Sequence, residues 1–128
     1  AAGPAILNAY LALGGNGSAA RGQDVVKLAA DGDPLADRVV RLLGRRVGRV
    51  LSWLVLVLDP AVVVLGGGVP RPSSVWWSEM EEELRAGLPD ALAEVPVVRA
   101  RHRNNAALLG AARDVFRLAG VPTTSEER

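Results

Sequence analysis

The stretch Leu58-Asp-Pro-Ala-Val-Val-Val-Leu-Gly-Gly-Gly-Val69 decides how the rest of the chain can fold. Its centre, Ala61 to Leu65, is an apolar run rich in β-branched residues, and three glycines follow it. Such a run is typical of a strand that is buried on both faces of a parallel sheet. We therefore predict a buried strand at 61–65 that ends in a glycine turn.

A long helix is expected before this strand, from about Pro34 to about Leu56. Asp33 can cap its first free amides, and Pro34 suits the first helical position because its missing N–H is not needed there. Apolar residues then recur at three- and four-residue steps. The last turns, Trp53 to Leu58, are almost wholly apolar and are expected to be buried on all sides.

Two glycines, Gly44 and Gly48, lie four residues apart within this helix. Each costs about 1 kcal/mol relative to alanine in a helix interior unless close packing compensates. Their spacing predicts that another element crosses the helix there at short range. Arginines at 38, 41, 45 and 49 form a stripe that we interpret as a solvated helix face rather than a DNA-binding surface.

Downstream of the glycines, the pattern predicts a helix capped by Ser73 or Ser74 and then a strand at 96–101. Glu79 falls on the wet side of this helix, and of the adjacent Trp76 and Trp77 only one is expected to point inward. Strand, helix and strand then form one right-handed βαβ unit. A last helix is expected at 106–119, and His102 is interpreted as a surface or loop residue.

Short helices are expected before the long one, the first after Pro4 and the second with Asp24 as its N-cap. Overall the 128 residues carry 49% hydrophobic residues, enough for one core. Fifteen basic and fourteen acidic residues leave a formal charge of +1, which argues against nucleic-acid binding by this region. The absence of cysteine and the single histidine argue against a metal centre within the chain.

Four segments resemble the ROK family, whose members are sugar kinases and sugar-responsive repressors. LDPAVVVLGGGV at 58–69 resembles its helix, buried strand and Gly-Gly turn, and 31–36 resembles the opening of its long helix. The segment at 2–5 resembles the start of the helix after the family's zinc motif, and 105–112 resembles its closing Gly-Ala-Ala helix. The order and spacing match the C-terminal half of such proteins.

This resemblance implies an α/β fold, the C-terminal part of an actin-like (RNase H-like) fold. In it a long helix precedes a βαβα unit with a buried parallel strand, and the sheet is incomplete within these residues. The lobe is expected at 1–120, followed by a polar tail at 121–128. In ROK kinases the Gly-Gly turn faces the adenosine of ATP, so Gly66, Gly67 and Gly68 are the candidate adenosine or effector-site residues.

Three functions remain open, of which a purely structural assembly domain is the least favoured. The first is the effector-sensing and dimerisation region of a sugar-responsive regulator, favoured because Pro70 and Pro72 depart from the kinase loop and Ala107 replaces a glycine. The alternative is the nucleotide side of an ATP-dependent sugar kinase. We expect no catalytic residue and no cofactor within this chain itself, because the resemblance places the phosphate loop, the catalytic Asp and the zinc motif upstream.

The resemblance also implies partners. They are the N-terminal part of the same protein, a second copy in a homodimer, and a sugar or sugar phosphate, with DNA bound only through an additional N-terminal module. ATP and Mg²⁺ are expected only if the whole protein is a kinase. The longest apolar stretches are far too short to cross a bilayer, so we expect no membrane association and a cytoplasmic location.

Overall fold

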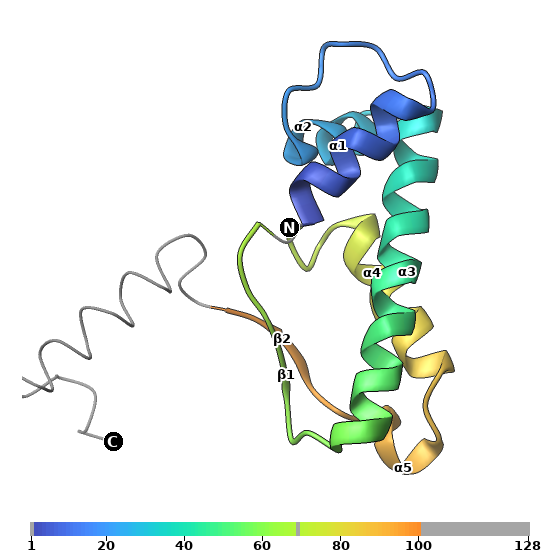
Figure 1. Cartoon of the computed structure of the whole chain (residues 1–128), viewed down its shortest axis with the longest axis vertical. Coiled ribbons are helices and arrows are strands. Elements are labelled where there is room, and N and C mark those ends of the chain that lie inside the picture. The colour runs from blue at the N-terminus through green and yellow to red at the C-terminus, as the bar shows by residue number, and fades with distance from the viewer. Residues whose placement is uncertain (1, 69, 101–128) are drawn as a thin grey trace, which may run out of the picture.

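The computed structural model describes residues 2–68 and 70–100, so the predictions for His102, the helix at 106–119 and the tail lie outside the described residues. The described elements are, in chain order, α1 (Ala2–Ala12), α2 (Gly22–Ala30), α3 (Pro34–Leu58), β1 (Val63–Leu65), α4 (Val75–Ala86), α5 (Asp90–Ala93) and β2 (Val97–Arg99). Helices α1 and α2 lie across one end of α3, α4 runs beside α3, and the two strands lie to one side of this helix pair (Figure 1).

Helix α3 begins and ends where its sequence signals are strongest. The Oδ1 atom of Asp33 accepts a hydrogen bond of 2.8 Å from the backbone N–H of Ala36, which confirms the predicted N-cap. The helix ends two residues later than predicted, where Asp59 adopts the left-handed region with φ 42°. Pro60 follows and cannot supply the N–H that another helical turn would need.

The start of α2 differs from the prediction. Arg21 is its N-cap, and Asp24 lies inside the first turn. The Oδ2 atom of Asp24 nevertheless accepts hydrogen bonds from the backbone N–H groups of Ala20, at 3.0 Å, and Arg21, at 2.8 Å. The Asp24 carboxylate thus caps α2 from within its first turn, because it accepts hydrogen bonds from preceding backbone N–H groups as in a capping box.

Helices α3 and α4 approach so closely that their backbones are in contact. A Cβ atom added at Gly44 would lie 2.5 Å from the carbonyl oxygen of Trp76, and one added at Gly48 would collide with the carbonyl oxygen of Met80. Both glycines are buried. The predicted short-range crossing is confirmed, and the element that crosses is α4.

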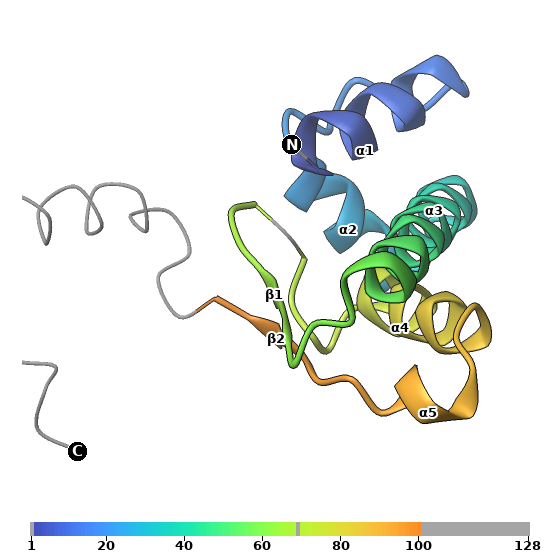
Figure 2. The same ribbon diagram turned by 60° about the horizontal axis from the view of Figure 1, so that its bottom comes forward.

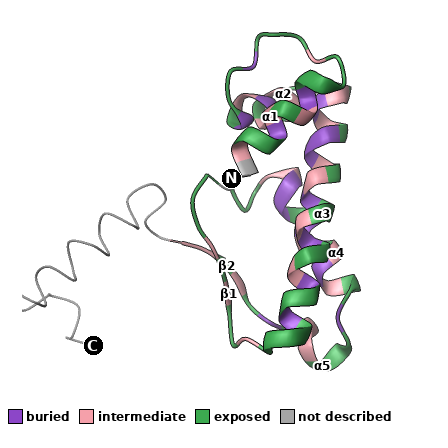
Figure 3. Ribbon diagram, in the orientation of Figure 1, coloured by how far each residue is buried: buried purple, intermediate pink, exposed green. Residues whose placement is uncertain are grey.

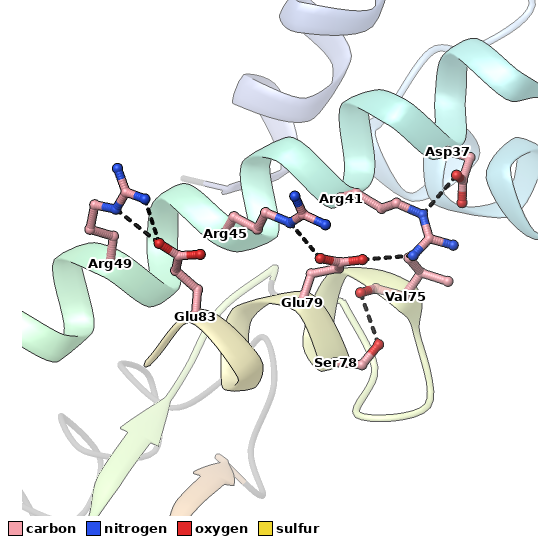
Figure 4. Close-up of polar contacts among 8 residues, drawn as sticks. All are labelled: Asp37, Arg41, Arg45, Arg49, Val75, Ser78, Glu79 and Glu83. Atoms are coloured by element: carbon pink, nitrogen blue, oxygen red, sulfur yellow. Dashed lines mark hydrogen bonds and ion pairs between the residues drawn. The ribbon is translucent and has the colours of Figure 1, made fainter. Parts of the chain in front are cut away.

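Beside these glycines, arginines of α3 pair with glutamates of α4 (Figure 4). Glu79 accepts hydrogen bonds of 2.6 Å from both Arg41 and Arg45, and Arg49 lies 2.6 Å from Glu83. The expectation that Glu79 faces water is wrong, because its side chain is only 8% exposed. A carboxylate can be buried at this depth because two guanidinium groups compensate its charge.

The main hydrophobic core lies between the helices, and both tryptophans at the start of α4 belong to it. Trp76 is 1% exposed and Trp77 4%, with their ring centroids 6.4 Å apart. The expectation that only one of them points inward is therefore wrong. Two faces of α4 are covered here, since partly buried Leu65 and Val97 of the strands pack against the same cluster as α1, α2 and α3.

The two strands pair in parallel, as predicted for the βαβ unit. Val63 lies opposite Val97 and Leu65 opposite Arg99, and the Ala100 N–H donates to the Leu65 carbonyl at 2.8 Å. Burial on both faces is not reached, because Val64 is 57% exposed. In the described ranges the sheet has only these two strands, so no neighbour covers the other edge of β1.

The end of α3 also differs from the prediction. Trp53 is 61% exposed and Val57 81%, although burial on all sides was expected over 53–58. Figure 3 shows buried and exposed residues alternating along this half of the helix. Within the described residues, no helix combines the length and the apolar character that a membrane span requires.

The backbone contact predicts the effect of a single methyl group. We expect Gly48→Ala to lower the free energy of unfolding by about 1 to 3 kcal/mol, because the new Cβ atom forces α3 and α4 apart. Gly17→Ala is the control, since a Cβ atom there meets nothing within 4 Å. Denaturant unfolding of the whole protein measures both, and equal stability of the two variants would contradict the close packing.

The buried carboxylate predicts a pH dependence. Hydrogen bonds from Arg45 and Arg41 lower the pKa of Glu79 despite its burial. A lowered pKa in the folded state stabilises the protein above the ordinary glutamate pKa, and this stabilisation is lost as the pH falls through the folded value. Glu79→Gln should therefore lower the melting temperature at pH 7 and have a much smaller effect at acid pH. Glu82→Gln, an exposed position of α4, should have little effect at either pH.

Candidate functional site

The glycine turn follows β1 directly and faces the helical part of the molecule. Gly67 has φ 77°, a backbone conformation that residues with a Cβ atom rarely adopt. Gly66 packs normally, with its added Cβ atom 3.8 Å from the Cβ of Ala100. Of the three predicted site residues, only Gly67 thus needs glycine for its conformation.

A pocket of about 650 Å³ lies beside this turn. Gly67 and Gly68 line it, whereas Gly66 does not, and its other walls come from α1, α2, the loop before α4 and the end of β2. In Figure 2 the turn between β1 and α4 approaches α2, consistent with one site built from segments far apart in sequence. Ligand contact by Gly66 to Gly68 remains a prediction.

Helix α2 supplies one continuous wall of the pocket. Its lining residues recur at helical spacing and are Gly22, Gln23, Val26, Lys27 and Ala30. Residues three and four apart share a face of a helix, so Gln23 and Lys27 present polar groups to the pocket beside the apolar Val26. Helix α1 adds Gly3 and the buried Ile6.

The loop before α4 forms the opposite wall, with Pro70, Arg71, Ser73 and Ser74. Ser74 fixes this loop because it is the N-cap of α4, and its hydroxyl donates to the Arg71 carbonyl at 2.6 Å. Its backbone N–H donates to the same carbonyl at 2.9 Å. Of the two predicted caps, Ser74 is therefore the one used.

The charged side chains among the described residues that line the pocket are all positive. Its described lining includes Lys27, Arg71 and Arg99 but no aspartate or glutamate. Apolar groups and serine hydroxyls complete the walls. This combination fits a ligand that has a flat apolar portion and negatively charged groups. Among the described residues, no group of three His, Cys, Asp or Glu side chains could hold a metal ion.

The sequence did not identify Gln23, Lys27, Arg71 or Arg99 as site residues. The helical spacing of 23 and 27 was visible, but nothing local indicates that this face of α2 lies opposite the glycine turn. That neighbourhood arises from the way in which α2 packs on α3 and α4 follows β1.

Comparisons with known proteins give consistent matches. A ROK family model matches residues 1–116. The N-acetylmannosamine kinases of Yersinia pestis (strain Pestoides F) and Yersinia pseudotuberculosis (serotype O:3, strain YPIII) are each 34% identical over 88 residues, which cover 69% of this chain and 29% of the relative. This chain thus spans less than a third of the length of these relatives.

A solved structure supports the fold. It is that of a candidate sugar kinase from Cytophaga hutchinsonii, with a TM-score of 0.65 and 28% sequence identity over 73% of this chain and 32% of that chain. The predicted fold class, an α/β part of the actin-like kinase fold, is confirmed by this likeness together with the parallel strand pair.

The turn conformation predicts a difference between neighbouring glycines. We expect Gly67→Ala to lower the free energy of unfolding by about 1 to 2 kcal/mol, because its φ of 77° is strained for any residue with a Cβ atom. Gly68→Ala should lower the free energy of unfolding by less than half as much, since a Cβ atom there meets nothing within 4 Å and the φ of Gly68 is not positive. Thermal unfolding of the two variants tests this, and a costlier Gly68→Ala would contradict the described turn.

Proposed function

Since the chain belongs to the ROK family, as the segments at 31–36 and 58–69 predict, we propose that it forms the nucleotide-binding part of an ATP-dependent sugar kinase. The observation that carries the proposal is the pocket beside the glycine turn, whose described lining combines apolar side chains with positive charges and has no aspartate or glutamate. The kinase names of the matched relatives support the kinase alternative over the regulator.

The pocket has the size and chemistry that a nucleotide requires. Small-molecule sites commonly have volumes of about 300 to 1,000 Å³, and this one has about 650 Å³. The glycines lack side chains, so the ribose can approach the backbone of the turn closely. Val26 and Ala30 of α2 offer an apolar surface to the base, and Ser73 offers a hydroxyl.

The loop at 70–74 no longer argues for a regulator. Its two prolines depart from the kinase pattern, but buried Pro70 is part of the pocket wall and leaves the pocket open. The other departure, at Ala107, lies outside the described residues. The ROK family includes both regulators and kinases, so the local departures alone favour neither.

The reaction proposed for the whole protein transfers the γ-phosphoryl group of ATP to a sugar hydroxyl. The hydroxyl oxygen forms the new P–O bond and loses its proton to a base, the bond to the β-phosphate breaks, and ADP leaves. Mg²⁺ would neutralise charge on the phosphates when ATP binds. Gly67 and Gly68 then position the nucleoside, while the catalytic base belongs to the rest of the protein.

The relatives' names suggest N-acetylmannosamine as the first sugar to test. We expect ADP release from ATP by the whole protein to depend on an added sugar, with N-acetylmannosamine tested beside its C2 epimer N-acetylglucosamine, beside N-acetylgalactosamine and beside glucose. ATP should also slow hydrogen exchange at the backbone amides of Gly66 to Gly68. A matched control uses GTP at the same concentration.

Two results together would overturn the proposal, namely no sugar-dependent ADP release with any of these sugars and no change in amide exchange on adding ATP. Sugar-dependent release of operator DNA by the same protein would then favour the regulator. Amide protection without turnover would limit the protein to nucleotide binding and would refute the kinase activity.

A further inference from the structure

We propose that Lys27 and Arg71 select the ligand by the negative charge of its phosphates, so that this wall of the pocket distinguishes nucleotides from nucleosides. The inference rests on the nucleotide site proposed above and deepens it by assigning specificity to two residues. Neither residue belongs to the glycine turn, and neither was indicated by the resemblance.

The first argument is the contrast between two sets of cations. Arg41, Arg45 and Arg49 of α3 each form an ion pair of 2.6 Å with a glutamate of α4, Arg41 and Arg45 sharing Glu79. Lys27 and Arg71, by contrast, form no ion pair with any residue of the described ranges 2–68 and 70–100. A pocket with unneutralised positive charge attracts an anionic ligand.

The second argument is that both cations are carried by fixed backbone. Lys27 lies within α2, one turn after Gln23 on the same face. The carbonyl of Arg71 accepts two hydrogen bonds from Ser74, one from its N–H and one from its hydroxyl. Only the side-chain rotamers have to be ordered when a ligand binds, which reduces the entropic cost of each contact.

The third argument concerns what kind of anion fits. A free phosphate would leave the apolar wall of Val26 and Ala30 without a partner. A neutral sugar would leave Lys27 and Arg71 without a negatively charged partner. A nucleoside phosphate satisfies both, because the base covers the apolar wall and the phosphates approach Lys27 and Arg71.

The expected loss of ADP affinity depends on how exposed Lys27 and Arg71 are. Both side chains are exposed, and solvent weakens ion pairs at such positions. We therefore expect removal of either charge to weaken ADP binding about three- to tenfold and to leave adenosine binding unchanged. Higher ionic strength should reduce the preference for ADP in the same direction.

Calorimetric titration of the whole protein with ADP, AMP and adenosine tests this inference. The variants are Lys27→Gln and Arg71→Gln, and the charge-preserving controls are Lys27→Arg and Arg71→Lys. Arg38→Gln removes an exposed charge of α3 that does not line the pocket, so it controls for net charge. Adenosine affinity equal to that of the unmodified protein verifies that each variant is folded.

The expected result is a smaller ratio of adenosine Kd to ADP Kd in Lys27→Gln and Arg71→Gln, and an unchanged ratio in the three controls. An unchanged ratio in both glutamine variants would overturn this inference while the nucleotide site itself stood. If the unmodified protein binds neither ADP nor adenosine, the proposed function is overturned instead.

Discussion

The close approach of α3 and α4 is the constraint on which the rest of the described structure depends. It is permitted by the missing side chains of Gly44 and Gly48, whose Cα atoms face backbone carbonyls of α4. Because α4 begins directly after the loop at 70–74, its position against α3 also fixes that loop. The packing of two helices thus determines where one wall of the pocket lies.

Much of this framework is predictable because its signals are local. The Asp33 cap, the paired glycines and the glycine turn each depend on backbone conformation or on the absence of a side chain, and sequence reveals both. The parallel order of 63–65 and 97–99 follows from the length of the connection between them. The limits of the predicted elements differ by a few residues, and the short helix α5 was not predicted.

The remaining features depend on neighbours that are distant in the sequence. Glu79 lies at a position that helical periodicity assigns to solvent, and only the presence of Arg41 and Arg45 on α3 allows its burial. Trp77 is buried in a cluster against which Leu65 and Val97 of the strands also pack. Lys27 and Arg71 meet at one pocket only through the tertiary fold, so the candidate site could be predicted at its glycines and not at its charged wall.

The exposed valines of β1 and of the end of α3 have a consequence for handling the protein. Val57 and Val64 are both exposed, and one edge of β1 is unpaired within the described part of the chain. Such an edge is a template for further strands. If these residues are expressed without the segments that cover them, intermolecular β-pairing and aggregation are favoured. Val64→Lys would oppose both by placing a charge on the exposed strand.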